Sequence, residues 1–204
     1  ASLRRLRTDW LDLLLLHRPD ALVEPEEVGR AFADLARAGK VRHFGVSNHS
    51  ASQIALLQKY LDQPLVVNQV ELNLWHAGLV EQGLVFNTGA PAARAATEGT
   101  LDYCRRHGIL VQAYSPIAKG KPWAAEGAEA RDDIRLIARL ASDRGVSPEA
   151  IALAWLLRHP AGIQPVTGTR TPARLRACCE ADRVALTREE WYGLLVAARG
   201  EPLP

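Results

Sequence analysis

Residues whose side chains could bind a ligand follow several short apolar runs of the chain. The first is His17, which stands directly after the leucine-rich run 11–16 and before Arg-Pro-Asp. A run of this length suits a strand that is buried on both faces, as in a parallel sheet covered by helices. Pro19 cannot continue a sheet ladder, so the strand ends near His17. Ligands bind at the carboxyl ends of parallel strands, which places His17 where function is expected.

Amides and an aromatic ring follow the next apolar runs. Ser47 and Asn48 end the second run, Gln69 ends the third, and Tyr114 and Ser115 end the fourth. Asparagine and glutamine each donate to and accept from an amide group, and a tyrosine ring offers a face for stacking. A ligand with a primary amide and a flat ring matches this set. Taken singly, each residue has a structural interpretation as well, as a turn residue, a strand-end group or a packed aromatic.

The segment after the fifth apolar run resembles an anion site. Gly168 precedes a predicted helix that carries Arg170 and Arg174. Backbone amides at a helix start, together with guanidinium groups, bind phosphate well. The alternative is that the two arginines form a solvated helix face, and Gly168 favours the phosphate site. With the amide and the ring, this segment predicts a nicotinamide dinucleotide that carries an extra phosphate.

Strands and helices alternate along the chain, which predicts an α/β fold with a parallel sheet and right-handed crossovers. We expect strands at 11–16, 41–46, 65–70, 109–113 and 163–166. We expect helices at 2–7, 25–38, about 51–61, 101–107, 131–144, 147–157, from the Gly168 motif through Cys179, and at about 187–198. The stretch 72–98 breaks the pattern and is predicted to be an irregular loop insertion, either covering the substrate or disordered. Five β/α units fit part of an eight-stranded barrel or an open doubly wound sheet, but no Gly-rich turn follows the first strand.

Composition narrows the class of protein further. Of the 204 residues, 48% are apolar and 24% charged, with a formal net charge of +2, which gives no strong basic field for nucleic acid. No apolar run approaches the roughly 20 residues of a membrane span. The three cysteines have neither metal-ligand spacing nor an even number, so we expect no metal and a cytoplasmic location. The chain has no methionine and starts at Ala1, so a start residue was removed or the chain is part of a longer protein.

Five motifs together resemble the aldo-keto reductases, and especially a bacterial branch of predicted oxidoreductases with a His-Arg-Pro-Asp motif. They are Leu-Leu-Leu-Leu-His-Arg-Pro-Asp at 13–20, Gly-Lys-Val-Arg-His-Phe-Gly-Val-Ser-Asn at 39–48, Asn-Gln-Val-Glu at 68–71, Ala-Tyr-Ser-Pro at 113–116 and Gly-Thr-Arg-Thr-Pro-Ala-Arg at 168–174. The resemblance implies a (β/α)8 TIM barrel, here a partial barrel that starts near the fourth strand, with residues 1–204 as the C-terminal portion of one domain. It also implies an NADPH-dependent reductase of aldehydes or ketones.

The resemblance assigns roles residue by residue. His17 would be the catalytic histidine that orients the substrate carbonyl and assists proton donation. The cofactor-binding residues would be Ser47, Asn48 and Gln69 at the carboxamide, Tyr114 on the nicotinamide ring, Ser115 and Ile117 at the pyrophosphate, and Gly168, Thr169, Arg170 and Arg174 at the adenosine 2′-phosphate. Cys178 stands where the family commonly has an asparagine against the adenine. We read the three cysteines most simply as buried apolar groups.

The catalytic Asp, Tyr and Lys of the family lie on segments that would precede this chain. We therefore expect an incomplete reductase whose 204 residues do not turn over NADPH alone. The alternative is a non-enzymatic NADPH-binding module, as in family members that are channel accessory subunits. A partial barrel would also leave two sheet edges open, at 11–16 and 163–166, and we expect self-association through them.

Overall fold

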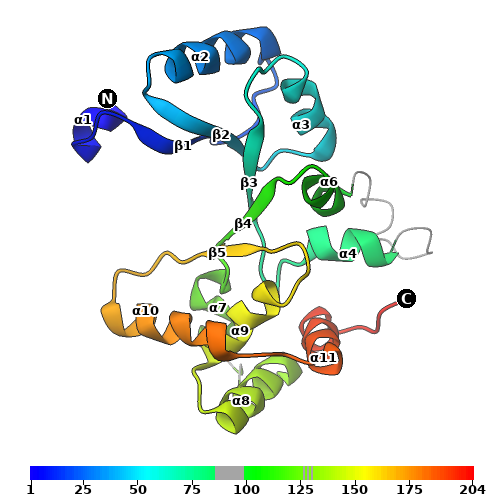
Figure 1. Ribbon diagram of the computed structural model, residues 1–204. Helices are drawn as coiled ribbons and strands as arrows, with labels where there is room; N and C mark the ends of the chain where they lie inside the picture. The colour runs from blue at the N-terminus through cyan, green and yellow to red at the C-terminus, as the bar shows by residue number, and fades with distance from the viewer. Residues whose placement is uncertain (86–98, 126, 128, 130) are drawn as a thin grey trace. The chain divides into compact units, whose positions relative to one another are not determined.

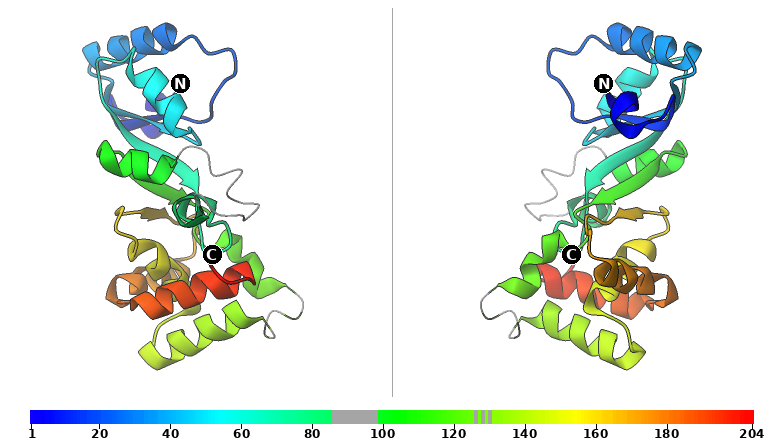
Figure 2. Two further views of the ribbon diagram at one scale, coloured as in Figure 1. Left: turned by 90° about the vertical axis from the view of Figure 1, so that its right-hand side faces the viewer. Right: turned by 90° about the vertical axis from the view of Figure 1, so that its left-hand side faces the viewer.

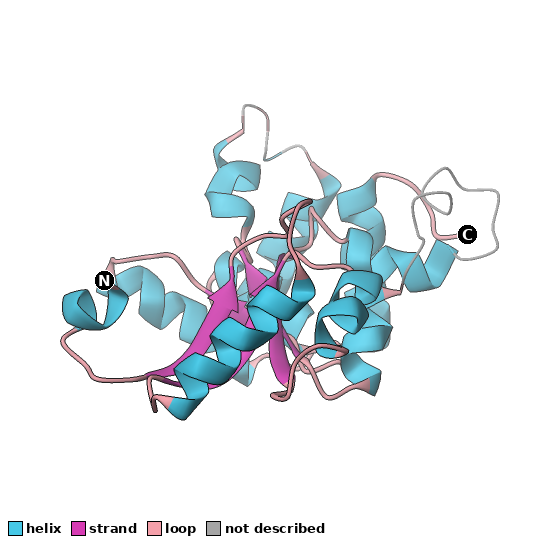
Figure 3. Ribbon diagram, turned by 90° about the horizontal axis from the view of Figure 1, so that it is seen from above, coloured by secondary structure: helices cyan, strands magenta, loops and turns pink. Residues whose placement is uncertain are grey.

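The computed structural model of the protein describes residues 1–85, 99–125, 127, 129 and 131–204 (Figure 1). Its strands form a five-stranded sheet in the order β1-β2-β3-β4-β5, and every pairing that is described is parallel. The strands are β1 (Leu11–Leu16), β2 (Val41–Ser47), β3 (Leu65–Glu71), β4 (Leu110–Tyr114) and β5 (Gln164–Val166). Figure 3 shows the strands in magenta and the helices that connect them in cyan. The predicted parallel α/β fold is confirmed.

The chain divides into two compact units. Unit 1 consists of Ala1–Val70 and Thr100–Val111, and unit 2 consists of Glu71–Gly99 and Gln112–Pro204. Each unit consists of two segments that are separate in the sequence, so neither unit is continuous along the chain. The prediction of one domain over 1–204 stays a prediction. No helix among the described residues is long and apolar enough to cross a membrane.

Unit 1 packs helices against a parallel three-stranded ladder. Its helices are α1 (Ser2–Leu6), α2 (Pro25–Arg37), α3 (Ala51–Gln58) and α6 (Thr100–Arg106). α2 begins with a proline and two glutamates, which suit a helix start, and contacts β2 through stacked Phe32 and Phe44 rings whose centroids lie 4.1 Å apart. Ser50 caps α3 by accepting a hydrogen bond from the Gln53 backbone N–H. The ladder pairs Ser47, the last residue of β2, with Gln69, which lies two residues before the end of β3.

The expectation that β1 is buried on both faces is wrong. Leu11 and Leu13 to Leu16 are each only partly buried, and Asp12 is exposed. β1 is an outermost strand of the sheet and pairs with β2 alone, so apolar surface on its other side stays open to solvent. β5 is the other outermost strand. Self-association through these two strands stays a prediction.

Unit 2 is mainly helical around α9 (Pro148–Leu157). The other helices are α4 (Gly78–Val85), α7 (Lys121–Ala124), α8 (Asp132–Arg144), α10 (Pro172–Cys179) and α11 (Arg188–Arg199), with short 3-10 turns at Ala118–Gly120 and Glu180–Arg183. α9 is apolar all round and buried from Ala150 to Leu156, which is typical of a helix enclosed on every side. Figure 2 shows α8 and α11 side by side, in contact with each other.

Two tryptophans hold α9 and α11 together. The rings of Trp155 and Trp191 stack with centroids 5.0 Å apart. Each indole N–H donates to the backbone carbonyl of the other residue, at 3.2 Å from Trp155 and 2.8 Å from Trp191. Burial of both rings therefore leaves no indole donor without an acceptor.

The predicted irregular loop at 72–98 is wrong over its first half. A bridge between Asn73 and His76 is followed by the helix α4 at Gly78–Val85. Val80 and Val85 of this helix are buried, so packing stabilises a segment whose glycines and short length gave a weak helical pattern. Residues 86–98, on which the rest of the predicted loop falls, lie outside the described residues.

Candidate functional site

His17 lies immediately after β1 in unit 1 and is exposed to solvent. Its strand is positioned by the ladder with β2, in which Leu16 is opposite Val46. The imidazole therefore stands at the carboxyl end of a parallel strand, as predicted, and one strand away from the end of β2. Catalysis by His17 stays a prediction, because position alone does not establish a role.

The carboxyl ends of β2 and β3 bring Ser47, Asn48 and Gln69 together. The Ser47 hydroxyl donates to the Gln69 carbonyl over 2.7 Å, and the Asn48 backbone N–H donates to the same carbonyl over 2.9 Å. The Asn48 side-chain amide donates to Ser47 Oγ over 2.9 Å. Ser47 is 4% exposed, whereas Asn48 and Gln69 are half-buried. Two amide side chains thus stand at adjacent strand ends.

Asn48 has a φ of 59°, in the left-handed region that asparagine visits more readily than most residues. This conformation ends β2 in a sharp turn. A side chain with a branched Cβ would be strained there. The sequence pattern Gly-Val-Ser-Asn at a strand end is consistent with such a turn, but it does not reveal what holds the turn in place.

Two buried polar residues that sequence reasoning did not assign hold this turn. Asn68 has no exposed surface, and its amide donates to the His49 carbonyl over 2.9 Å while its oxygen accepts from the His49 N–H at 3.4 Å. His49 is 6% exposed, and its Nδ1 lies 2.9 Å from the Ser47 carbonyl. Burial lowers the pKa of His49 below its usual value. His49 is therefore a structural residue of the turn.

The sequence contains a feature that could have identified Asn68 as a buried, hydrogen-bonded residue. A strongly polar residue interrupts the apolar run 65–70 at a position that the β3 pattern reserves for a buried side chain. Such a residue needs hydrogen-bond partners inside the protein. It finds them in His49 and in the thiol of Cys104, whose pKa is raised by burial. Cys104 is buried, as predicted.

In unit 2 a second left-handed turn follows β4. Tyr114 ends the strand half-buried and opposite Val166 of β5, and Ser115 has a φ of 51°. The amide of Asn73, which is 1% exposed, donates to the Ser115 carbonyl over 3.0 Å. Both predicted binding turns are therefore held by a buried asparagine from another segment, Asn68 in unit 1 and Asn73 in unit 2.

The segment from Gly168 to Arg174 departs from the prediction in one respect. α10 begins only at Pro172, so Arg170 precedes the helix and Arg174 lies in its first turn. Thr169 shapes the approach to the helix, because its hydroxyl accepts from the Thr171 N–H at 3.2 Å. Both arginines are exposed, and neither makes an ion pair within the described part of the chain. Their charges are consequently available to an anion.

Cys178 and Ile117 meet in the interior of unit 2. Ile117 packs against a buried cluster of Ala150, Leu153, Cys178 and Ala181. Burial, followed by the nearby Glu149 carboxylate, raises the pKa of the Cys178 thiol. Cys178 is thus a buried apolar group, as predicted, but Cys179 is exposed, so the same prediction is wrong for Cys179.

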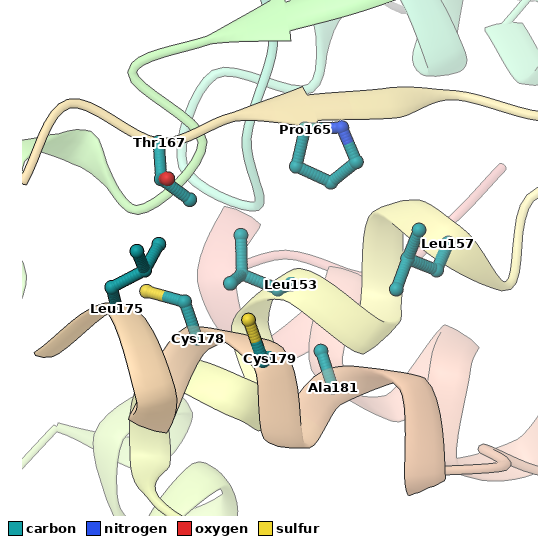
Figure 4. Close-up of a pocket in the computed structure, with 8 residues that line it drawn as sticks. All are labelled: Leu153, Leu157, Pro165, Thr167, Leu175, Cys178, Cys179 and Ala181. Atoms are coloured by element: carbon teal, nitrogen blue, oxygen red, sulfur yellow. The ribbon is translucent and has the colours of Figure 1, made fainter. Parts of the chain in front are cut away.

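The cluster borders an open pocket of about 210 Å³. Figure 4 shows the pocket between α10 and the strand segment that carries Pro165 and Thr167, with both α10 thiols turned toward it. Its walls are the residues Leu153, Leu157, Pro165, Thr167, Leu175, Cys178, Cys179 and Ala181. Apart from Thr167 and the thiols these side chains are apolar, so the pocket offers van der Waals contact and few hydrogen bonds. An adenine contact at Cys178 stays a prediction.

Parallel β/α architecture with an imidazole, amides and a tyrosine at successive strand ends is typical of β/α-barrel proteins, a class that binds ligands at its strand ends. Comparison with known proteins narrows this class. The model of the Aldo/keto reductase family matches residues 1–194, and the chain belongs to that family.

Curated relatives are 29% to 37% identical to the chain over the aligned residues. It is 37% identical over 207 residues to the uncharacterized oxidoreductase YcsN of Bacillus subtilis, and 36% identical over 203 residues to a 6-dehydroglucose reductase of Novosphingobium aromaticivorans. These alignments cover 100% of this chain but 63% and 62% of the relatives. A putative voltage-gated potassium channel subunit beta of Schizosaccharomyces pombe is 29% identical over 190 residues, covering 86% of this chain and 55% of its own.

Solved structures of similar proteins have the same fold. A thermostable aldo-keto reductase, Tm1743, superimposes with a TM-score of 0.76 at 26% identity, over 96% of this chain and 63% of its own. An aldo/keto reductase of Klebsiella pneumoniae, solved with NADP and acetate, gives a TM-score of 0.76 at 28% identity. The superposition covers 100% of this chain and 63% of the Klebsiella chain. The chain spans less than two thirds of the length of these proteins. The predicted partial barrel is confirmed as the fold class.

Proposed function

We propose that this chain carries the NADPH-binding residues of a reductase that converts an aldehyde or ketone to an alcohol. The observation that carries the proposal is the group of Ser47, Asn48 and Gln69, three polar residues joined through one carbonyl at two adjacent strand ends. The family of the chain and the NADP in the Klebsiella relative support it. Primary amides and a hydroxyl match the donors and acceptors of a nicotinamide carboxamide.

In this proposal polar residues of β2, β3 and the turn after β2 bind the carboxamide of the cofactor. Ser47, Asn48 and Gln69 hold the carboxamide, which fixes the orientation of the nicotinamide ring and so the direction of hydride transfer. His17, exposed at the end of the neighbouring strand, orients the carbonyl of the substrate and assists its protonation. The cofactor supplies the hydride, and the protein supplies position and polarity.

The proposal assigns the other parts of the cofactor to residues 114–117 and 168–174. Tyr114 stacks on the nicotinamide ring, and Ser115 and Ile117 border the pyrophosphate. Gly168, Thr169, Arg170 and Arg174 bind the adenosine 2′-phosphate. The two exposed arginines favour this assignment, because a guanidinium makes charge-assisted hydrogen bonds to phosphate oxygens.

Calorimetric titration of the chain with NADPH and with NADH tests the proposal. We expect saturable binding of one equivalent of NADPH, with NADH weaker because it lacks the 2′-phosphate. Asn48→Ala is expected to weaken both cofactors, since both carry the carboxamide. Ser52→Ala, an α3 variant outside the proposed contacts, serves as the matched control. Absence of NADPH binding by the folded chain would refute the proposal.

A second candidate is a non-enzymatic NADPH-binding module. The similarity to the yeast channel subunit beta favours it. Both candidates predict NADPH binding, and turnover separates them. Incubation of the whole protein with NADPH and a panel of aldehydes and ketones, followed by nicotinamide absorbance, gives oxidation for a reductase and none for a binding module.

A further inference from the structure

The turn that ends β2 depends on residues that touch no predicted ligand. Asn48 follows the last residue of β2 and is held in the left-handed region with a φ of 59°. The hydrogen bonds to the Gln69 carbonyl fix the first side of the turn. The second side is the backbone of His49, which leads to the Ser50 cap of α3.

Asn68 clamps that second side from the interior. Its side chain bonds both the N–H and the carbonyl of His49, at 3.4 and 2.9 Å. A single amide that satisfies both backbone groups of one residue fixes the orientation of the backbone there. Asn68 is completely buried, so water does not replace these bonds without opening the core.

His49 adds a third restraint within the same turn. Its Nδ1 lies 2.9 Å from the Ser47 carbonyl, while its ring is buried. The restraint folds the side chain back over the turn and ties residue 49 to residue 47. The backbone is therefore held on both sides of Asn48, and the Asn48 amide donates to Ser47 Oγ beside it.

We infer that Asn68, acting through the backbone of His49, is the positioning residue that sets the orientation of the Asn48 amide for the nicotinamide carboxamide. This inference rests on the proposed function. Asn68 makes no contact with the cofactor in it, and neither does His49. Preorganisation of this kind lowers the entropy cost of ordering the site when the cofactor binds. Its loss should weaken binding of the nicotinamide carboxamide and leave binding of the adenosine 2′-phosphate unchanged.

The test compares the binding affinity of the whole cofactor with that of a cofactor fragment that does not reach the turn. NADPH carries the nicotinamide carboxamide, and 2′,5′-ADP carries the adenosine 2′-phosphate without it. Asn68→Leu keeps the size of the side chain and removes both hydrogen bonds to His49. We expect it to weaken NADPH by about tenfold or more, with 2′,5′-ADP within about twofold of wild type.

Two further variants make the result specific. Leu57→Ala removes a buried side chain of α3 and destabilises unit 1 without touching the turn, so the ratio of the two affinities should stay as in wild type. His49→Phe keeps a buried ring and removes the contact to the Ser47 carbonyl. It should lower NADPH affinity selectively, by less than Asn68→Leu, and it keeps the test open if Asn68→Leu fails to fold.

The outcomes separate the inference from the proposed function. Failure of the wild-type chain to bind NADPH would refute the proposed function, and the inference with it. Wild-type binding of NADPH together with equal losses of NADPH and 2′,5′-ADP in the folded variants would refute the inference alone. Unchanged NADPH affinity in folded Asn68→Leu would do the same.

Discussion

Replacement of Arg174 by alanine gives the sharpest test of the phosphate end. Arg174 lies in the first turn of α10, exposed and with no ion pair among the described residues. Its guanidinium therefore gives up no internal partner when it binds the adenosine 2′-phosphate. Helix N-termini also attract anions through their free backbone N–H groups, although Pro172 contributes none.

The magnitude follows from the type of bond and its exposure. A hydrogen bond to a charged group contributes about 1.5 to 3 kcal/mol, equivalent to about 12- to 160-fold in affinity. Arg174 is open to solvent, which screens its charge. We therefore expect the lower end of the range, a loss of about 12-fold for NADPH, and little change for NADH.

Calorimetric titration at two salt concentrations measures the effect. Arg176→Ala is the matched control, since it removes an equally exposed arginine of the same helix that has no proposed contact. The loss for Arg174→Ala should shrink at high salt, because screening already weakens the wild-type contact. Equal losses for NADPH and NADH, or a loss for Arg176→Ala as large as that for Arg174→Ala, would refute the reasoning.

Two stability predictions concern the framework of the two units. In Gly45→Ala the new Cβ would lie 2.7 Å from the Val67 carbonyl oxygen, a backbone atom that cannot move aside; urea denaturation should show a loss of about 1 to 3 kcal/mol, and an unchanged midpoint would contradict this packing. The hydrogen bond from Arg144, 2.6 Å long, lowers the pKa of Glu190 below its usual value. The ionised pair therefore stabilises the fold above the unfolded pKa of Glu190, and that stability is lost as pH falls through the lower folded pKa. Glu190→Gln should lower stability near neutral pH and flatten its acid dependence, whereas an acid profile identical to wild type would contradict the pairing.

The elements of the fold were predictable because their signals are local. Pro25 with the glutamates after it starts α2, and Gly145 in the left-handed conformation ends α8, as the sequence indicates. Each expected strand is present within one or two residues of its predicted bounds. The strand-end residues follow from those bounds, so Ser47, Asn48 and Gln69 could be placed together from the sequence and parallel pairing.

Other features depend on contacts between segments far apart in the chain. The half-buried state of β1 follows from its place at the outside of the sheet, which the leucine run does not encode. α4 forms where packing buries Val80 and Val85, although two glycines and its short length weaken its helical pattern. The start of α10 at Pro172 removes Arg170 from the helix.

The sequence by itself determined the family, the parallel α/β class and the polar residues at the strand ends, because these depend on motif order and on short-range periodicity. Only the tertiary structure decided what holds those residues. Asn68 bonds to His49 across two strands, and Asn73 bonds to Ser115 across 42 positions of sequence. Buried polar groups must find partners wherever the fold supplies them, so their partners are fixed by three-dimensional packing and not by spacing in the chain.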